Sequence, residues 1–173
     1  MKKCKNCKLE FVPINFNQKY CLSTECLKVW VLIAKDIEWN KRKVKLKNNL
    51  KTNQELLKTA QLHFNKFIRI RDKGQNCISC NKEAKKENAG HYYSQGGHSA
   101  VRFEEDNVHL QCEHCNTYLS GNLLNYQIGI QKRIGGERLI ELQSKAHLEK
   151  KWSKEELNEI IKIYKNKVKN VIY

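Results

Sequence analysis

Proline and long apolar runs are scarce in this chain. Pro13 is the only proline among 173 residues, and 29% of the residues are charged, which together favour a largely helical, well-solvated structure. No apolar run approaches the roughly 20 residues of a membrane-spanning helix. The N-terminal stretch MKKCKNCKLE also lacks the apolar core of a signal peptide. We therefore expect one ordinary domain or two small ones, in a reducing cytoplasm.

Acidic residues are also few. Lysines and arginines number 33 against 18 aspartates and glutamates, so the formal net charge is +15. This charge predicts a polyanionic partner, of which nucleic acid is the commonest, and an anionic membrane surface is the alternative.

Cysteine, in contrast, is abundant, and the eight cysteines form two quartets that contain Cys-x-x-Cys pairs typical of zinc sites. The first quartet is Cys4, Cys7, Cys21 and Cys26, and the second is Cys77, Cys80, Cys112 and Cys115. In a reducing compartment these residues are metal ligands, although a secreted disulfide protein is the alternative. Residues 1–26 are too few to bury much apolar surface, so we expect zinc to order them. With both sites filled, the net charge falls from +15 to about +11.

Apolar residues at helical spacing predict a helix after the first quartet. Its apolar face comprises Leu27, Trp30, Val31, Ala34 and Ile37. The pattern continues into a basic run with no acid through Lys51, which includes Lys41, Arg42, Lys43, Lys45 and Lys47. We interpret this run as a phosphate-binding arm, because no acidic block neutralises it. A solvated basic helix or linker is the alternative.

Further helical patterns follow. Thr52 and Glu55 form a capping box before an apolar stripe of Leu57, Ala60, Phe64, Phe67 and Ile68, and Gly74 ends that helix. Tyr126 to Ile134 is helical and precedes a turn at Gly135-Gly136. Ser153 and Glu156 open a last helix, with a seam of Leu157, Ile160, Ile161, Tyr164, Val168 and Val171. We expect the seam to pack in the core, and a homodimer contact is the alternative.

The residues between the cysteines of the second quartet have the composition of a small hydrolytic site. Hydrolysis of a phosphodiester needs a base that takes a proton from water and a cation that neutralises the leaving oxygen. A zinc-stapled β-hairpin followed by a helix can hold both, with His91 ending the first strand, Asn107 before the second and Asn116 at the helix start. Each also has an ordinary interpretation, as a structural histidine, a turn cap and a helix N-cap.

This pattern resembles the HNH, or His-Me finger, endonucleases. The resemblance is carried by Gly90-His91, by Asp106-Asn107 and by CEHCN, which ends at Asn116. It implies that His91 is the general base, that Asn107 pins the loop bearing it, and that Asn116 binds a catalytic metal. An amide oxygen suits Mg²⁺ or Mn²⁺, distinct from the thiolate-bound zinc.

The chain departs from that family at Gly90. Many HNH members have an Asp or a His there that binds the metal, and glycine has no side chain. Substitute ligands are Asn88, three residues before His91, and His109 on the facing strand. Arg69 and Arg71, which precede the module, either contact phosphates or lie on a solvated helix face.

A longer, ordered series of motifs resembles the NinG family, also called Rap, of phage recombination endonucleases. The series is QKYC, FIRIRD, CISC, AGHYY, VRFEEDNVHLQC, CNTYLSGNL and RIGGERL, followed by Trp152-Ser153. The resemblance implies an enzyme of the bacterial host cytoplasm that cuts branched DNA, such as Holliday junctions and D-loops. Recombination proteins are further partners that it implies.

We therefore expect an α+β, mostly helical protein with a ββα-metal core that a Cys4 zinc site staples and helices flank. Residues 1–26 form a zinc-binding segment, 27–51 a basic helical arm, and 52–173 the nuclease domain, with its catalytic module at about 77–122. The alternative is a non-catalytic zinc protein that binds DNA or recombination partners. RNA binding ranks last, because the chain has no RNP-type aromatic motif.

Overall fold

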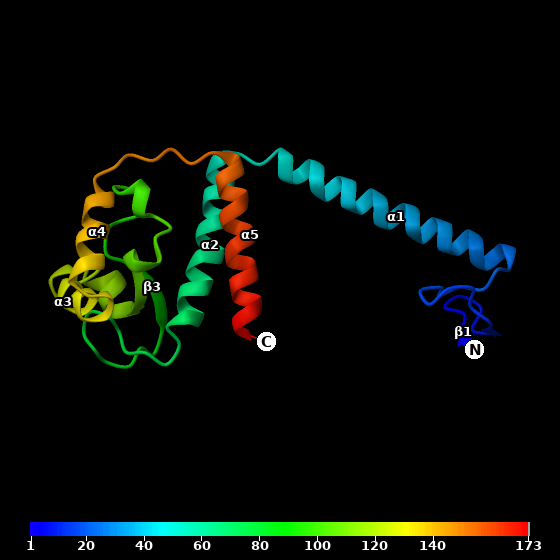
Figure 1. Cartoon of the computed structure of the whole chain (residues 1–173), viewed down its shortest axis with the longest axis horizontal. Helices are drawn as coiled ribbons and strands as arrows, with labels where there is room; N and C mark the ends of the chain where they lie inside the picture. The colour runs from blue at the N-terminus through cyan, green and yellow to red at the C-terminus, as the bar shows by residue number, and fades with distance from the viewer. Residues whose placement is uncertain (173) are drawn as a thin grey trace. The chain divides into compact units, whose positions relative to one another are not determined.

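The computed structural model describes residues 1–172, except for the side chains of residues 48, 49 and 172. Within these residues the chain is α+β and mostly helical, as predicted (Figure 1). It divides after Lys51 into two compact units. No helix in the described part of the chain is long and apolar enough to cross a membrane.

The first unit holds a small hairpin and one long helix. β1 (Lys2–Lys3) pairs antiparallel with β2 (Glu10–Phe11). α1 (Thr24–Asn49) then runs as one continuous helix that includes both the predicted apolar face and the basic run. The expected boundary between residues 26 and 27 therefore falls inside α1, and Cys26 lies in its first turn.

The apolar face predicted for this helix is largely uncovered. Trp30 and Ile37 are each 50% exposed, and Val31 is 41% exposed. Within its own unit, α1 meets the cysteine segment at its N-terminal end, where Cys26 is buried and Leu27 and Trp30 line a pocket with residues 14–22.

The second unit is built on two helices that lie side by side, α2 (Asn53–Arg71) and α5 (Lys154–Ile172) (Figure 1). The predicted capping box of α2 is confirmed: Glu55 N donates to Thr52 Oγ1 at 3.2 Å, and Thr52 N donates to Glu55 Oε2 at 2.8 Å. The core between the helices comprises Leu56, Ala60, Phe64, Phe67, Ile68, Leu157, Tyr164 and Val168.

The core shows which residues of the predicted apolar faces of α2 and α5 are buried. Leu56 occupies the buried face of α2, one helical turn before Ala60, and the predicted Leu57 packs partly buried against the same core. Leu157, Tyr164 and Val168 of the α5 seam pack in the core, as expected, with Ile160 and Ile161 partly buried against it. Val171, by contrast, is 55% exposed.

A β-hairpin lies between α2 and the remaining helices (Figure 1). β3 (Glu87–His91) pairs antiparallel with β4 (Val108–Cys112), with His91 opposite Val108 and Gly90 opposite His109. Two 3₁₀ turns, η1 (Ser99–Val101) and η2 (Glu105–Asn107), form the connection. A π-helical turn, η3 (His114–Tyr118), follows β4.

The other side of the hairpin is covered by α3 (Leu123–Ile134) and α4 (Gly136–Ala146), which join at the predicted glycine turn. Their buried side chains form a second apolar cluster of Ile78, Val101, Tyr126, Ile130, Leu139, Leu142 and Ala146. The hairpin is thus held from two sides, which fixes the position of the side chains at its end.

Candidate metal centres and active site

The second quartet of cysteines converges at the base of the hairpin. The sulfur atoms of Cys77, Cys80, Cys112 and Cys115 all lie within 4.8 Å of one another, and none of them is in a disulfide. Burial raises the pKa of Cys77, but hydrogen bonds from backbone amides outweigh it and lower the pKa to about 7. Four thiols so arranged, with amides ready to stabilise thiolates, fit a tetrahedral Zn²⁺ site.

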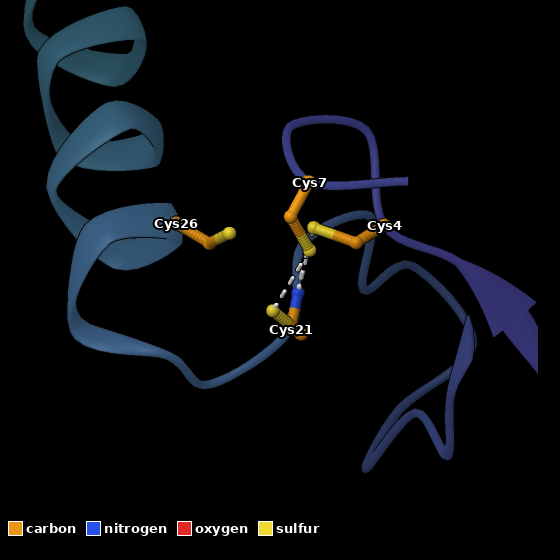
Figure 2. A group of neighbouring side chains, drawn as sticks. All are labelled: Cys4, Cys7, Cys21 and Cys26. Atoms are coloured by element: carbon orange, nitrogen blue, oxygen red, sulfur yellow. Dashed lines mark hydrogen bonds between the residues drawn. The ribbon is translucent and has the colours of Figure 1, made fainter. Parts of the chain in front are cut away.

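The first quartet converges in the same way, with Cys26 reaching in from α1 toward the three cysteines of the preceding loops (Figure 2). Cys4 and Cys26 are each only 1% exposed. Cys21 N donates to Cys4 Sγ at 3.3 Å, and such amide contacts lower the pKa of Cys4 to about 6 despite the burial that raises it. This donor set also fits Zn²⁺, which would tie α1 to the N-terminal segment.

An open cavity of about 560 Å³ lies beside the end of β3. Four of the side chains predicted to form the site line it: Asn88 and His91 from β3, Asn116 from η3, and Arg69 from α2. These residues span 48 positions of the sequence but line one cavity. They come together because the hairpin packs on α2 and because η3 directly follows β4, the partner strand of β3.

His91 is held in its neutral form. Burial is the main cause that lowers its pKa, to about 4. Gln61 accepts a hydrogen bond from Arg102 Nε at 2.9 Å through its Oε1, so its amide nitrogen is the atom that lies 3.4 Å from His91 Nε2. An amide nitrogen can only donate, which requires Nε2 of His91 to carry a lone pair. His91 is therefore a proton acceptor at neutral pH.

Asn107 lies outside the cavity and is fully buried. Its Oδ1 accepts from Tyr93 N at 2.8 Å, and its Nδ2 donates to the carbonyl oxygens of Tyr93 and Val101, each at 3.0 Å. Its own carbonyl accepts from Tyr92 N at 2.9 Å. Asn107 thus fixes the chain directly after His91, which is the contact pattern expected of a loop-pinning residue.

The cavity also contains residues that the sequence analysis missed. Glu113 lines the wall and pairs with Lys86, which lines it too, and Asn65, Ser94 and Gln95 are further polar lining residues. Glu113 brings the one carboxylate among the lining residues. Its place between two cysteines of the second quartet, directly after Cys112, is the signal that could have identified it.

Gly90 has no room for the acidic side chain that many HNH nucleases have there. A Cβ on Gly90 would lie 2.9 Å from the Cβ of Gln111 and closer still to its Oε1. Gln111 is fully buried and its Nε2 donates to Ser79 Oγ and to the Gly121 carbonyl, at 2.7 and 2.6 Å. The glutamine therefore occupies the space beside Gly90.

His109 and Arg71 correct two predictions. His109 lies on the opposite face of the hairpin from His91, is 3% exposed, and uses both ring nitrogens: Nδ1 accepts from Arg71 at 3.1 Å and Nε2 donates to the Asp106 carbonyl at 3.1 Å. It is therefore not placed to bind a metal in the cavity.

The side chain of Arg71 likewise forms hydrogen bonds with groups of the protein itself. Its guanidinium donates to Asp72 at 2.7 and 2.9 Å, and to the carbonyls of Glu105 and Val108 at 3.0 and 2.8 Å. These contacts join the end of α2 to the hairpin, so Arg71 is structural rather than a phosphate ligand. Arg69, by contrast, lines the cavity.

The five predicted phosphate-binding residues of the basic run are all exposed on the C-terminal half of α1. Among the described side chains, Arg42 has an ion pair with Glu38 at 2.6 Å, one turn away on the same helix. The arm thus presents a concentrated positive charge to solvent, as a phosphate-binding surface requires.

Comparison with known proteins finds relatives over almost the whole chain. The family model described as "Bacteriophage Lambda NinG protein" matches residues 1–172. Protein ninG of Escherichia phage 933W is 36% identical over 98% of this chain and 93% of its own length, and that of Escherichia phage lambda is 35% identical with the same coverage. Protein ninG of Salmonella phage P22 is 34% identical, and no solved structure matches. The chain therefore belongs to the NinG family of bacteriophage proteins.

Proposed function

We propose that this protein is a metal-dependent DNA endonuclease that hydrolyses phosphodiester bonds in branched recombination intermediates, such as Holliday junctions and D-loops. The observation that carries the proposal is the cavity in which a neutral histidine, four amides, a carboxylate and an arginine meet beside a cysteine-stapled hairpin. The resemblance to the HNH nucleases supports the reaction. The resemblance to the NinG, or Rap, endonucleases supports the substrate.

His91 supplies the base in this proposal. A water that attacks phosphorus must lose a proton as the new P–O bond forms, and a neutral imidazole can take it. Gln61 and Arg102 orient the ring, while Asn107 fixes the backbone that follows. The attacking water would replace the 3.4 Å contact from Gln61 to reach the lone pair on Nε2. The proton then passes from the imidazolium to solvent, which returns His91 to its neutral form.

The oxygen donors around the cavity suit a hard cation. Asn88 and Asn116 offer amide oxygens and Glu113 offers a carboxylate, a set that fits Mg²⁺ or Mn²⁺ better than Zn²⁺. When bound, such an ion supplies positive charge to the leaving 3′ oxygen. Glu113 thus takes over the part that an acid at position 90 has in many HNH nucleases, and its ion pair with Lys86 must open for it to do so.

Arg69 and the basic face of α1 are the surfaces proposed to contact phosphates. Arg69 lines the same cavity as His91, so it is suited to the phosphate next to the scissile bond. The five basic residues of α1 would hold DNA without reading its sequence.

The test separates metal binding from cleavage. Mn²⁺ binding to the zinc-loaded protein is measured by electron paramagnetic resonance, alongside cutting of a labelled four-way junction as Mg²⁺ is raised. We expect Glu113→Gln and Asn116→Ala to weaken Mn²⁺ binding and to shift the Mg²⁺ dependence of cutting to higher concentration. Glu137→Gln on α4, outside the cavity, is the control. Unchanged Mn²⁺ binding in both variants would remove these residues from the proposed site.

A second function, a non-catalytic zinc protein that binds DNA or recombination proteins, has one observation in its favour. Gly90 lacks the acid found in many HNH nucleases, and Gln111 fills the space for it. Tight junction binding without cutting in Mg²⁺ or Mn²⁺ would favour this function over the first.

A further inference from the structure

The first unit contains an open pocket that the proposed nuclease site does not use. The pocket has a volume of about 500 Å³ and lies where residues 14–22 meet the start of α1. This volume falls within the range of small-ligand sites, roughly 300–1,000 Å³. The pocket belongs to the first unit alone and is far along the sequence from His91.

Two aromatic side chains give the pocket flat apolar walls. Trp30 projects from α1 and is 50% exposed, although tryptophan usually buries most of its surface in a folded protein. Tyr20 lies across the loop and is partly buried, and Leu27 adds an aliphatic surface beside it. An exposed indole in an ordered pocket wall is a surface on which a planar ring can stack.

The polar groups of the pocket are amides and an ammonium, and no acid lines it. The side chains of Asn15 and Asn17 are exposed at the wall, and each offers a donor and an acceptor. Gln18 is already used: its Oε1 accepts from Ile14 N at 2.7 Å and its Nε2 donates to the Tyr20 carbonyl at 2.9 Å. Gln18 therefore shapes the loop rather than contacting a ligand.

Lys19 places a positive charge at the same wall. Its carbonyl accepts from Lys5 N at 2.9 Å, which ties the pocket loop to the turn between Cys4 and Cys7. Two exposed apolar side chains project from this loop, Ile14 at 76% and Phe16 at 89% exposure. Apolar side chains beside a basic rim are the combination that proteins insert at distorted DNA steps.

We propose that this pocket binds an unpaired nucleobase of branched DNA, stacked on Trp30 with Lys19 beside the adjoining phosphate. The inference rests on the proposed action on DNA and adds a means of selecting its substrate. The aromatic walls match the face of a base, Asn15 and Asn17 match its hydrogen-bonding edge, and the absence of acid matches the phosphates. A base pair at a branch point opens more readily than one inside regular duplex, because the helical stack is interrupted there. The pocket would therefore favour branched over linear DNA.

The test uses 2-aminopurine, a fluorescent base, placed at the branch point of a four-way junction or inside one arm. The full-length protein carries His91→Ala, so that cleavage does not interfere with binding. We expect binding to change the fluorescence at the branch point and not in the arm. Trp30→Ala should abolish that change and weaken junction binding roughly 5- to 150-fold, the range for loss of one base-aromatic stack. Trp30→Phe should retain most of both.

Trp39→Ala is the matched control, since Trp39 is 62% exposed on the same helix and does not line the pocket. It should leave the fluorescence change intact, and Trp30→Ala should leave linear-duplex binding and zinc content unchanged. An equal loss in both alanine variants, or an equal loss on linear duplex, would overturn the inference. So would a change of oligomeric state in Trp30→Ala with junction binding intact, because the pocket would then hold a second copy of the chain. Because binding is measured without cleavage, these outcomes do not depend on whether the nuclease proposal holds.

Discussion

At the scale of single residues, the proposed base chemistry depends on the protonation state of His91, because only a neutral imidazole can accept a proton. Its neutrality arises from burial and from the amide group of Gln61, whose orientation Arg102 sets. The folded-state pKa of about 4 lies below the ordinary 6.5 of histidine. The stabilisation from neutral His91 is therefore complete above pH 6.5 and is lost as the pH falls toward 4.

Titration of His91 by NMR tests this directly. We expect its imidazole to titrate near pH 4 in the wild type. Gln61→Glu should raise that pKa toward or above the ordinary value, because a carboxylate beside Nε2 favours imidazolium. His63, which lies on α2 and does not line the cavity, provides an internal reference. Titration of His91 near 6.5 in the wild type would contradict this account of the base.

The tight space at Gly90 gives a second prediction at this scale. Gly90→Asp should not restore a usual metal ligand and should destabilise the fold by about 1–3 kcal/mol through overpacking against Gln111. Gly96→Asp is the control, because a Cβ at Gly96 has nothing within 4 Å. Urea unfolding measures both. Equal stability of the two variants would mean that Gln111 gives way freely, and Gly90→Asp/Gln111→Ala should recover part of the loss.

At the scale of elements, Asp72 joins α2 to the hairpin that carries the cavity. It is 2% exposed, accepts two hydrogen bonds from Arg71, and accepts from Leu110 N at 2.9 Å. Burial acts to raise its pKa, but the hydrogen bonds and positive charge of Arg71 and the bond from Leu110 N outweigh that effect and hold the pKa well below its usual range. Its stabilising contribution is therefore present above its ordinary pKa and is lost only in strong acid.

Asp72→Asn should accordingly cost about 3 kcal/mol, because it removes the nearer countercharge of the largely buried Arg71 guanidinium and leaves the more distant Glu105, at 4.0 Å. Asp36→Asn, on the exposed surface of α1, should change stability little. Chemical unfolding monitored by circular dichroism compares them. Similar unfolding midpoints for the two variants would show that this network does not hold the hairpin to α2.

At the scale of the whole molecule, the chain carries a net charge of +15 across two units, with the cavity in one and the basic helix face in the other. Alanine at Lys41, Lys43 and Lys45 should weaken junction binding and make it less sensitive to salt. The slope of log binding constant against log salt concentration should become shallower by up to roughly 0.9 for each phosphate that the variant no longer neutralises. Alanine at Lys154, Lys162 and Lys169 of α5 is the control. An unchanged slope in the α1 variant would show that these lysines do not contact DNA phosphates.

The sequence could predict those features that depend on local pattern. Helical spacing and the Thr52–Glu55 box located α2, and cysteine spacing located both cysteine clusters that could hold a metal. Gln61 and Arg102 could not be found in this way, since they reach His91 from other elements with no pattern that links them. The error at His109 was avoidable: side chains alternate along a strand, so a residue opposite Gly90 faces away from His91.

The most direct test of the central claim is single-turnover cleavage of a labelled four-way junction, with linear duplex as substrate control. Wild type, His91→Ala and His63→Ala are compared in Mg²⁺, in Mn²⁺ and without added divalent ion, with junction binding measured on the same samples. We predict junction-selective, divalent-dependent cutting that leaves 5′-phosphate ends, is lost in His91→Ala and is retained in His63→Ala. Equal cutting by His91→Ala, or tight binding without cutting by the wild type, would contradict the account.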